Sequence, residues 1–222
     1  MPKPELAFDH VVVTCDNLAR GMDYIRHVFG VDIPVGGQHE FMGTHNAVMA
    51  VGDGIYFEVI AIDPSMKAPA YPRWFGLDNP KIKNQMSSQD IGGGPILMHY
   101  VLRTPDIAAT LADLTPELRK KLGPVHEASR GDLSWQITIN PTGLPPEGGC
   151  LPALIEWDGT PPQYGMAQHY GKAGPLFERI ELCHPETERL TGELLAMGAG
   201  ALINKGMISL HDSAAARLKA AF

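Results

Sequence analysis

Apolar positions along the first 62 residues fall into strand and helix patterns in a fixed order. Residues 7–15 (AFDHVVVTC) are rich in β-branched side chains, which predicts a short buried strand. Apolar side chains then recur at helical spacing over 18–29, between a capping residue, Asp16 or Asn17, and Gly30. Three further runs predict strands at about 38–41, 44–51 and 55–62. The predicted order of this unit is β-α-β-β-β.

The same order returns in the second half of the chain. Residues 96–103 predict a strand, and Thr104 and Pro105 are expected to open a helix that runs to residue 114. A polar excursion at 115–122 separates this helix from strand patterns at 125–129, 133–139 and 151–157. The order of elements repeats although the sequence identity between the copies is low, which indicates two related modules.

Four segments follow from this repeat. We expect a first βαβββ module at 1–63, a connecting segment at 64–95, a second βαβββ module at 96–160 and a βαβ-like C-terminal extension at 161–222. The extension carries a strand pattern, a helix pattern and weaker strand material at 177–183, 186–197 and 201–210, which suggests a partial third unit. The long connecting segment is either functional or a packed linker.

Each module places a histidine on its first strand and a glutamate on its last. These residues are His10 and Glu58 in the first module, and His99 and Glu156 in the second. An ionisable side chain in an apolar strand is costly to bury unless it is paired or coordinated. Two imidazoles and two carboxylates would form an N₂O₂ ligand set for Zn²⁺, Ni²⁺, Co²⁺, Fe²⁺ or Mn²⁺. The alternative for His10 is a core or substrate-contacting histidine beside Asp9.

Motifs in both modules resemble the vicinal oxygen chelate superfamily, which has the glyoxalase-like fold. The segments that carry the resemblance are FDHVVV, YFEVIAI, LMHYVL and ALIEW, within residues 7–160. The string Gly43-Thr44-His45-Asn46 and the RWFGLD segment at 73–78 are similar to the glyoxalase-like domain family in particular. The resemblance implies an α+β fold in which paired βαβββ modules form one curved, mostly antiparallel sheet around a cleft.

The resemblance also implies a function. His10, Glu58, His99 and Glu156 match the metal-ligand places of the superfamily, and Glu156 inherits the role of catalytic base. A metal-dependent lyase, isomerase or ring-opening dioxygenase that acts on a small oxygenated substrate through a chelated intermediate is therefore expected. The alternatives are a metal-free protein of the same fold that sequesters a small molecule, and an idle member that serves oligomer contacts.

Five further side chains are candidates for contact with the substrate. His45 and Asn46 begin a strand and could hydrogen-bond a substrate, or could stabilise a turn that carries a surface histidine. Trp74, Trp135 and Trp157 could form the wall of an apolar cleft, although aromatic side chains are more often core residues. In contrast, we expect His39, which precedes a glutamate, to lie at a solvated strand edge.

Composition and charge narrow the class of partner. The 222 residues include 18 Lys and Arg against 25 Asp and Glu, and the basic residues form no run, which disfavours nucleic acid and anionic membranes. No apolar stretch has the length of a membrane helix, and no apolar leader is visible. Three well-separated cysteines without a CxxC pair are typical of a reduced compartment. We expect a cytoplasmic protein with a small-molecule substrate, and a homodimer is one option for its assembly.

Overall fold

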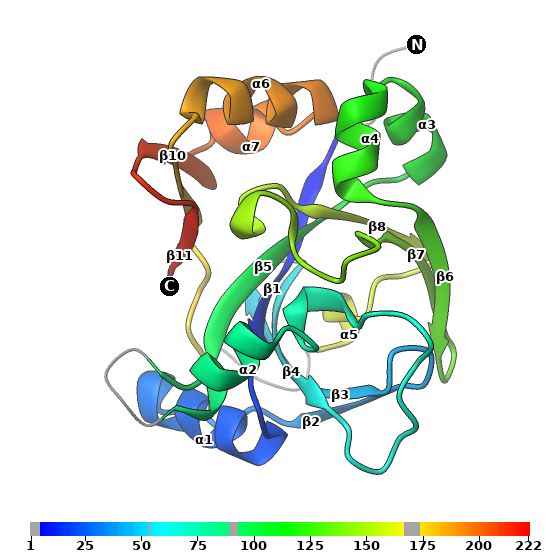
Figure 1. Ribbon diagram of the computed structural model, residues 1–222, viewed down its shortest axis with the longest axis vertical. Coiled ribbons are helices and arrows are strands. Elements are labelled where there is room, and N and C mark those ends of the chain that lie inside the picture. Colours follow the sequence, from blue (N-terminus) through cyan, green and yellow to red (C-terminus); the bar gives the residue numbers. More distant parts are fainter. Residues whose placement is uncertain (1–4, 53, 89–92, 167–173) are drawn as a thin grey trace.

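Two sheets organise the chain in the computed structural model, which describes residues 5–52, 54–88, 93–166 and 174–222 (Figure 1). The larger sheet has eight strands in the order β2-β3-β4-β1-β5-β8-β7-β6, and the smaller has three in the order β10-β9-β11. The edge strands of the larger sheet, β2 and β6, contact each other, so the sheet curves until it is nearly closed. The predicted α+β fold with a curved, mostly antiparallel sheet is confirmed.

The first half of the sheet follows the predicted β-α-β-β-β order. Its elements are β1 (Ala7–Thr14), α1 (Leu18–Phe29), β2 (Val35–His39), β3 (Thr44–Gly52) and β4 (Ile55–Ile62). Helix α1 begins where the Asn17 side chain accepts a hydrogen bond from the backbone N–H of Arg20, and it ends at Gly30, whose φ of 70° is left-handed. Local sequence signals therefore fix both ends of this helix.

A segment with two short helices precedes the second half of the sheet. These are the 3₁₀ turn η1 (Trp74–Gly76) and α2 (Pro80–Ser87). The elements that follow are β5 (Ile96–Arg103), α3 (Ile107–Ala112), α4 (Pro116–Leu122), β6 (Val125–Arg130), β7 (Leu133–Thr138), η2 (Pro146–Gly149) and β8 (Ala153–Asp158).

The prediction for residues 104–122 is wrong in two places. Helix α3 begins later than expected, because Asp106 and not Thr104 accepts the capping hydrogen bond, from the backbone N–H of Ala109. The expected polar excursion forms α4, in which Thr115 is the N-cap and Pro116 occupies the first helical position. Leu118 and Leu122 are buried on one side of α4, so a short amphipathic helix was mistaken for a loop.

The C-terminal extension forms the smaller sheet and its helices. Its elements are α5 (Gln163–Met166), β9 (Arg179–His184), α6 (Thr187–Met197), α7 (Gly200–Asn204), β10 (Ile208–Asp212) and β11 (Arg217–Ala221). Strand β9 is central, with β10 parallel and β11 antiparallel to it. In Figure 1, α6 and α7 lie at the same end of the molecule as α3 and α4, and α1 lies at the other end. The expected strand at 201–210 is wrong for its first part, which is α7.

The two faces of the large sheet bury different sets of side chains. Val11, Tyr100 and Leu154 point to the outer face, where they belong to a core that includes Ile25 of α1 and Leu190 of α6. The inner face carries a second apolar cluster, with Val12, Ile60 and Ile155 from the strands and Trp74 and Phe75 from the segment before β5. That segment therefore packs against the inner face of the sheet. No helix within the described ranges is long and apolar enough to cross a membrane.

A β-bulge at Asp9 decides which side chains of β1 reach the inner face. Phe8 pairs with Leu102 of β5 and His10 pairs with Val101, so two residues advance on β1 for one on β5. Simple alternation predicts that Phe8 and His10 share a face, but Phe8 belongs to the outer core. The bulge turns His10 inward.

Candidate functional site

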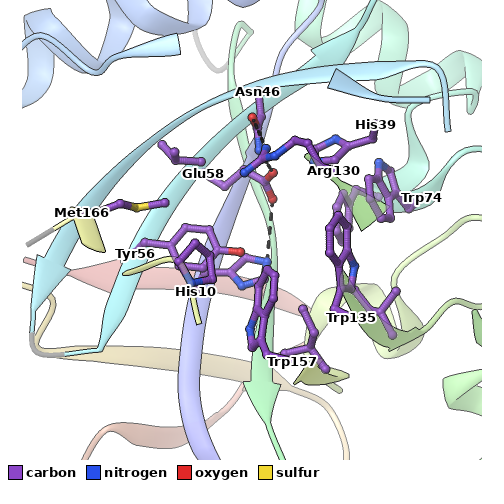
Figure 2. A pocket seen from close by; sticks show the side chains of 15 residues that line it. His10, His39, Asn46, Tyr56, Glu58, Trp74, Arg130, Trp135, Trp157 and Met166 are labelled. Carbon is purple, nitrogen blue, oxygen red and sulfur yellow. Dashed lines mark hydrogen bonds and ion pairs between the residues drawn. The ribbon is translucent and has the colours of Figure 1, made fainter. Parts of the chain in front are cut away.

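The inner face of the large sheet encloses a cavity with about 430 Å³ of space, part of it open to solvent. Strands from both modules line it, together with η1 and α5. Its polar side chains are His10, His39, Asn46, Glu58 and Arg130, and its aromatic ones are Tyr56, Trp74, Trp135 and Trp157 (Figure 2). The predicted cleft between the modules therefore corresponds to this cavity.

His10 is held by the carboxylate of its neighbour Asp9. The Nδ1 atom of His10 lies 2.7 Å from Oδ1 of Asp9, and the imidazole stacks on the Tyr56 ring with centroids 4.3 Å apart. Because Asp9 is an acceptor, Nδ1 carries a proton and Nε2 is the nitrogen that faces the cavity. The ring is therefore fixed in both its tautomer and its orientation.

Asp9 is wholly buried and is surrounded by hydrogen-bond donors. Its Oδ2 atom accepts from Arg103 Nη1 at 3.0 Å, Trp157 Nε1 at 3.1 Å and Gln163 Nε2 at 2.9 Å. Burial alone would raise the pKa of Asp9, but the hydrogen bond and charge of His10 and the charge of Arg103 outweigh it, so the pKa lies below its usual value. The Asp9 carboxylate therefore keeps its negative charge next to Nδ1 of His10.

Glu58 presents one free oxygen to His10. Its Oε1 atom accepts a hydrogen bond from Asn46 Nδ2 at 2.6 Å, and its Oε2 atom lies 3.7 Å from His10 Nε2. That separation exceeds a direct hydrogen bond. The imidazole and carboxylate therefore face each other across a gap at the cavity wall, as Figure 2 shows.

Arg130 brings a positive charge to the same wall from the other module. Its Nη1 atom donates to Asn46 Oδ1 at 3.0 Å, and the backbone N–H of Gly37 donates to the same oxygen at 2.9 Å. In the part of the chain that the structure describes, no carboxylate forms an ion pair with Arg130. The guanidinium group thus has donors left for a ligand in the cavity.

His39 is buried against this site, contrary to the expectation of a solvated edge. Its Nδ1 atom lies 3.1 Å from Thr44 Oγ1, and its ring packs edge-on against Trp74. Burial, with a further contribution from the charge of Arg130, lowers the pKa of His39 to about 3, so this histidine is neutral at physiological pH.

His99 does not join His10 and Glu58. It is 2% exposed and lines a second cavity, beyond Trp74 and Phe75, where its ring lies 5.9 Å from that of Phe75. Burial lowers the pKa of His99 to about 3. The His99 side chain lies on the inner face of the sheet, as the strand pattern predicts, but it lines the second cavity and not the first.

Glu156 points away from the cavity. Its Oε2 atom accepts a hydrogen bond from the backbone N–H of Ile107 at 2.7 Å, at the start of α3, while its neighbours Ile155 and Trp157 line the cavity. Strand register explains the difference. Val12 pairs with Glu58 in the first module, and the corresponding Val101 pairs with Ala153 in the second. Glu156 lies an odd number of residues from that position and faces the other side.

The four predicted ligands therefore do not form an N₂O₂ metal site. In the described ranges, no group of three or more His, Cys, Asp or Glu side chains is placed to hold a metal ion. Only His10 and Glu58 approach each other, and a divalent metal held by protein side chains ordinarily needs at least three. These donors do not fit the divalent metal that the sequence resemblance implies. The prediction that Glu156 is the catalytic base is also wrong, because its carboxylate lies outside the cavity.

His45 and Asn46 are separated by the same alternation. Asn46 lines the cavity, whereas His45 points from the opposite side of β3, where its Nδ1 atom lies 3.6 Å from Asp63 Oδ2. The predicted pair therefore contributes one residue to the cavity. Trp74 and Trp157 both lie in its wall.

Sequence reasoning did not propose a role for three polar side chains of the cavity, those of Tyr56, His39 and Arg130. Tyr56 shares the parity of Glu58 on β4, so strand periodicity could have found it, whereas Trp135, a candidate for the cleft wall, does line the cavity. His39 lies in a polar run that hid its burial. Arg130 ends β6, and its position opposite Asn46 depends on closure of the sheet, which no local pattern signals.

Comparison with known proteins supports the fold. A hypothetical protein from Staphylococcus aureus, of known crystal structure, is 16% identical and superposes with a TM-score of 0.56 over 97% of this chain and 92% of its own. Methylmalonyl-CoA epimerases from Streptomyces coelicolor and Mycobacterium tuberculosis are 17% and 14% identical. Their TM-scores are 0.41 and 0.40 over 72% and 71% of this chain, and over 99% and 91% of their own. No curated protein matches the chain.

The sequence model of one family covers most of the chain. The glyoxalase-like domain matches residues 8–198, which include both halves of the large sheet, the cavity and helix α6. This agrees with the motifs that resemble the family, the GTHN string and the RWFGLD segment. The chain belongs to the glyoxalase-like domain family.

Proposed function

We propose that this protein is an enzyme that moves a proton on a small oxygenated substrate, with Glu58 and His10 as its acid–base pair. The observation that carries the proposal is the 3.7 Å gap between Glu58 Oε2 and His10 Nε2 at the cavity wall. Each of these atoms is the free end of a group whose other end is already hydrogen-bonded, by Asn46 and Asp9 respectively. Such positioning is what general acid–base catalysis requires.

The charge of Arg130 indicates the kind of substrate oxygen that the cavity accepts. A carbonyl or carboxylate oxygen directed at the guanidinium group would gain charge-assisted hydrogen bonds in a poorly solvated site. Removal of a proton from the adjacent carbon places negative charge on that oxygen, and Arg130 would stabilise this charge. The substrate class is therefore a small carbonyl compound with an acidic C–H bond.

Aromatic side chains form the rest of the cavity and suit the carbon skeleton of such a substrate. Trp135 and Trp157 lie with ring centroids 5.3 Å apart, and Trp157 is anchored by its hydrogen bond to Asp9. Apolar walls of this kind exclude water and strengthen the electrostatic interactions inside. The walls provide binding while the polar groups fix the orientation of the substrate.

In the proposed reaction, Glu58 removes the proton from carbon, and His10 Nε2, whose lone pair faces the cavity, takes the proton of a substrate hydroxyl and passes it to the neighbouring substrate oxygen. When the carboxyl of Glu58 gives its proton to the neighbouring carbon the substrate is isomerised, and when it gives that proton to a departing group the reaction is a lyase reaction. Of the reaction classes predicted from sequence, we propose the isomerase and lyase classes. We derive no step through a metal, since the predicted ligands do not converge.

Hydrogen exchange tests this proposal directly. Purified protein would be incubated in D₂O with a panel of 2-hydroxy ketones, 2-oxo acids and their thioesters, and the loss of the α-proton signal followed by ¹H NMR. We expect exchange of at least one compound, and we expect Glu58→Gln to slow it by about 100-fold or more because the base is lost. Glu156→Gln makes the same chemical change outside the cavity and should leave the rate unchanged.

A binding protein of the same fold is the competing function, because the three tryptophans can hold a ligand without chemistry. Quenching of their fluorescence by a compound that undergoes no exchange would favour sequestration. Exchange that persists in Glu58→Gln would contradict the assignment of the base. Each result separates binding from catalysis.

A further inference from the structure

A β-bulge in β2 lies opposite Asn46 of β3. From Val35 to Gln38 the chain advances three residues on β2 for two on β3, and the residues between them on β2 are Gly36 and Gly37. A bulge turns backbone groups out of the regular ladder of hydrogen bonds. Here the backbone N–H of Gly37 donates to the side chain of Asn46, at 2.9 Å from its Oδ1 atom. The bulge therefore supplies a donor to a residue of the cavity wall.

Both positions of the bulge need glycine, because polar side chains of the site occupy the space beside them. A Cβ atom at Gly36 would overlap Asn46 Oδ1, and a Cβ atom at Gly37 would lie 2.7 Å from Arg130 Cδ. Both approaches are closer than van der Waals contact allows, so a larger residue would displace Asn46 or Arg130. The two glycines thus let β2 pass directly against the polar wall of the cavity.

The donors around Asn46 determine which way its side-chain amide is oriented. The backbone N–H of Gly37 and Nη1 of Arg130 can only donate, so the atom that faces them is the oxygen Oδ1. The nitrogen Nδ2 must then face Glu58, and it donates to Glu58 Oε1 at 2.6 Å. Asn46 is 2% exposed, so water hardly competes for these bonds. The three hydrogen bonds allow one orientation of the amide.

Asn46 also lies between two opposite charges. Glu58 and Arg130 both line the cavity, and each is hydrogen-bonded to a different end of the Asn46 amide. A direct ion pair between them would use the carboxylate and guanidinium groups that the proposed reaction directs at the substrate. The amide instead bonds to one oxygen of Glu58 and one nitrogen of Arg130. Glu58 Oε2 and the remaining donors of Arg130 are left for the cavity.

We propose that Asn46 is a positioning residue of the acid–base site, and that the bulge formed by Gly36 and Gly37 holds its amide in place. Asn46 bonds to Glu58 of the first module through Nδ2 and to Arg130 of the second module through Oδ1. It thereby aligns the proposed base with the group that would bind the substrate oxygen. Because Glu58 is a base only under the function proposed above, this role of Asn46 rests on that function.

Asn46→Asp tests the amide, because it keeps the size of the side chain and replaces the donor that faces Glu58 by an acceptor. Two carboxyl groups in such contact cannot both be ionised, so they should share a proton at neutral pH. We expect α-proton exchange at pH 7 to fall at least about tenfold and to recover at higher pH, with the profile displaced by at least about one pH unit. Asn204→Asp makes the same change at an exposed position of α7 and should leave the profile unchanged.

Gly36→Ala tests the bulge. The added Cβ atom should displace the Asn46 amide and slow exchange at least about fivefold, because the base is no longer held in position. In the Asn46→Ala background the same substitution should have no further effect, since the side chain that it displaces is absent. Gly52→Ala in β3 is the control, because a Cβ atom there would meet nothing closer than 4.0 Å. We expect Gly52→Ala to exchange at the wild-type rate.

Two NMR measurements test the position of Asn46 whether or not the protein catalyses exchange. In Asn46→Asp, the ¹³C carboxyl resonances of Glu58 and of the new aspartate should titrate together, as coupled groups do. In the protein that keeps Asn46, its side-chain ¹H and ¹⁵N resonances should move in Glu58→Gln, in which an uncharged acceptor replaces the carboxylate. They should stay in place in Glu156→Gln, which makes the same change outside the cavity.

Three results would overturn the proposal. An Asn46→Asp variant that slows exchange equally at every pH would leave Asn46 with a structural role only. A loss in Gly36→Ala that persists in the Asn46→Ala background would show that the bulge does not act through Asn46. Independent titration of the two carboxyl groups, or Asn46 resonances that ignore Glu58→Gln, would exclude the contact itself. Absence of exchange in the wild-type protein would instead contradict the proposed function, and the NMR measurements would still decide the position of Asn46.

Discussion

The carboxylate of Asp9 lies 2.7 Å from Nδ1 of His10, at a bulge that turns these adjacent residues toward each other. Its other oxygen accepts hydrogen bonds from Arg103 on β5, Trp157 on β8 and Gln163 on α5. One buried carboxylate therefore joins both halves of the sheet to the extension that follows them. Asp9, which orients the proposed catalytic His10, therefore depends both on the local bulge in β1 and on contacts with residues far away in the sequence.

Replacement of Asp9 by Asn should cost both stability and activity. Arg103 would lose its buried partner and His10 would lose its fixed tautomer, so we expect unfolding by urea to require about 3 kcal/mol less free energy. Asp16→Asn is the matched control, because its ion pair with Arg20 is exposed and contributes at most about 1 kcal/mol. A loss from Asp9→Asn no larger than that of the control would contradict the proposed role of Asp9.

The pH dependence of the same variant has a definite sign. The pKa of Asp9 is lowered in the folded chain, so its stabilisation is fully present above the ordinary value of 3.8 and declines as the pH falls through the lower folded value. The difference in unfolding free energy between wild type and Asp9→Asn should therefore be constant from pH 5 to 8 and shrink below about pH 3.8. Urea titrations at several pH values check this. A difference that grows with acidity has the wrong sign.

His39 should make the stability of the wild-type protein depend on pH in a higher pH range than Asp9 does. Burial lowers its pKa from 6.5 to about 3, so between these values the unfolded chain binds a proton that the folded chain excludes. Stability then falls with decreasing pH by at most about 1.4 kcal/mol per unit from this residue. His39→Gln should reduce the loss of unfolding free energy between pH 6.5 and 5 by about 1–2 kcal/mol, whereas the exposed His27→Gln should not. Equal slopes in both variants would exclude this role for His39.

How far the sequence predicts the fold depends on which contacts are local. The caps Asn17 and Gly30 and the alternation along β1 and β4 are local, so the order of elements in the first module follows from them. The failure at α4 is also local in origin. The Thr115-Pro116 start signal is present in the sequence, but the run of charged residues that follows it leaves only Leu118 and Leu122 as apolar positions, a pattern that is also typical of a loop.

The sequence predicts a residue of the candidate site correctly only where the alternation within a single strand determines which face its side chain occupies. Alternation correctly groups Tyr56 with Glu58, but it does not say which face of β8 becomes the inner one. That choice is made by the pairing of Val101 with Ala153, so Glu156 was assigned to the wrong side. The place of Arg130 in the site could not be predicted for a related reason. Arg130 reaches Asn46 only because the sheet closes between β2 and β6.

Helix α6 offers a stability test that involves no part of either cavity. Gly192 is exposed in its interior, and a Cβ atom added there would meet nothing within 4 Å. Glycine costs a helix interior about 0.5–1 kcal/mol relative to alanine, because more backbone entropy is lost on folding. Gly192→Ala should therefore raise the free energy of unfolding by about that amount. An unchanged or lower value would show that α6 does not persist as a regular helix in solution.

Metal analysis tests the corrected ligand set. His10 and Glu58 are two donors, and His99 and Glu156 lie in other surroundings, so we expect no tight stoichiometric binding of Zn²⁺ or Co²⁺ after dialysis against a chelator. Elemental analysis and the absorption spectrum of added Co²⁺ provide the measurements. Glu156→Gln should leave the metal content unchanged, because its carboxylate caps α3 and does not face the cavity. One equivalent of metal that is lost in both His99→Gln and Glu156→Gln would instead require β8 to shift by one residue, and it would restore the four-ligand metal site predicted from the sequence.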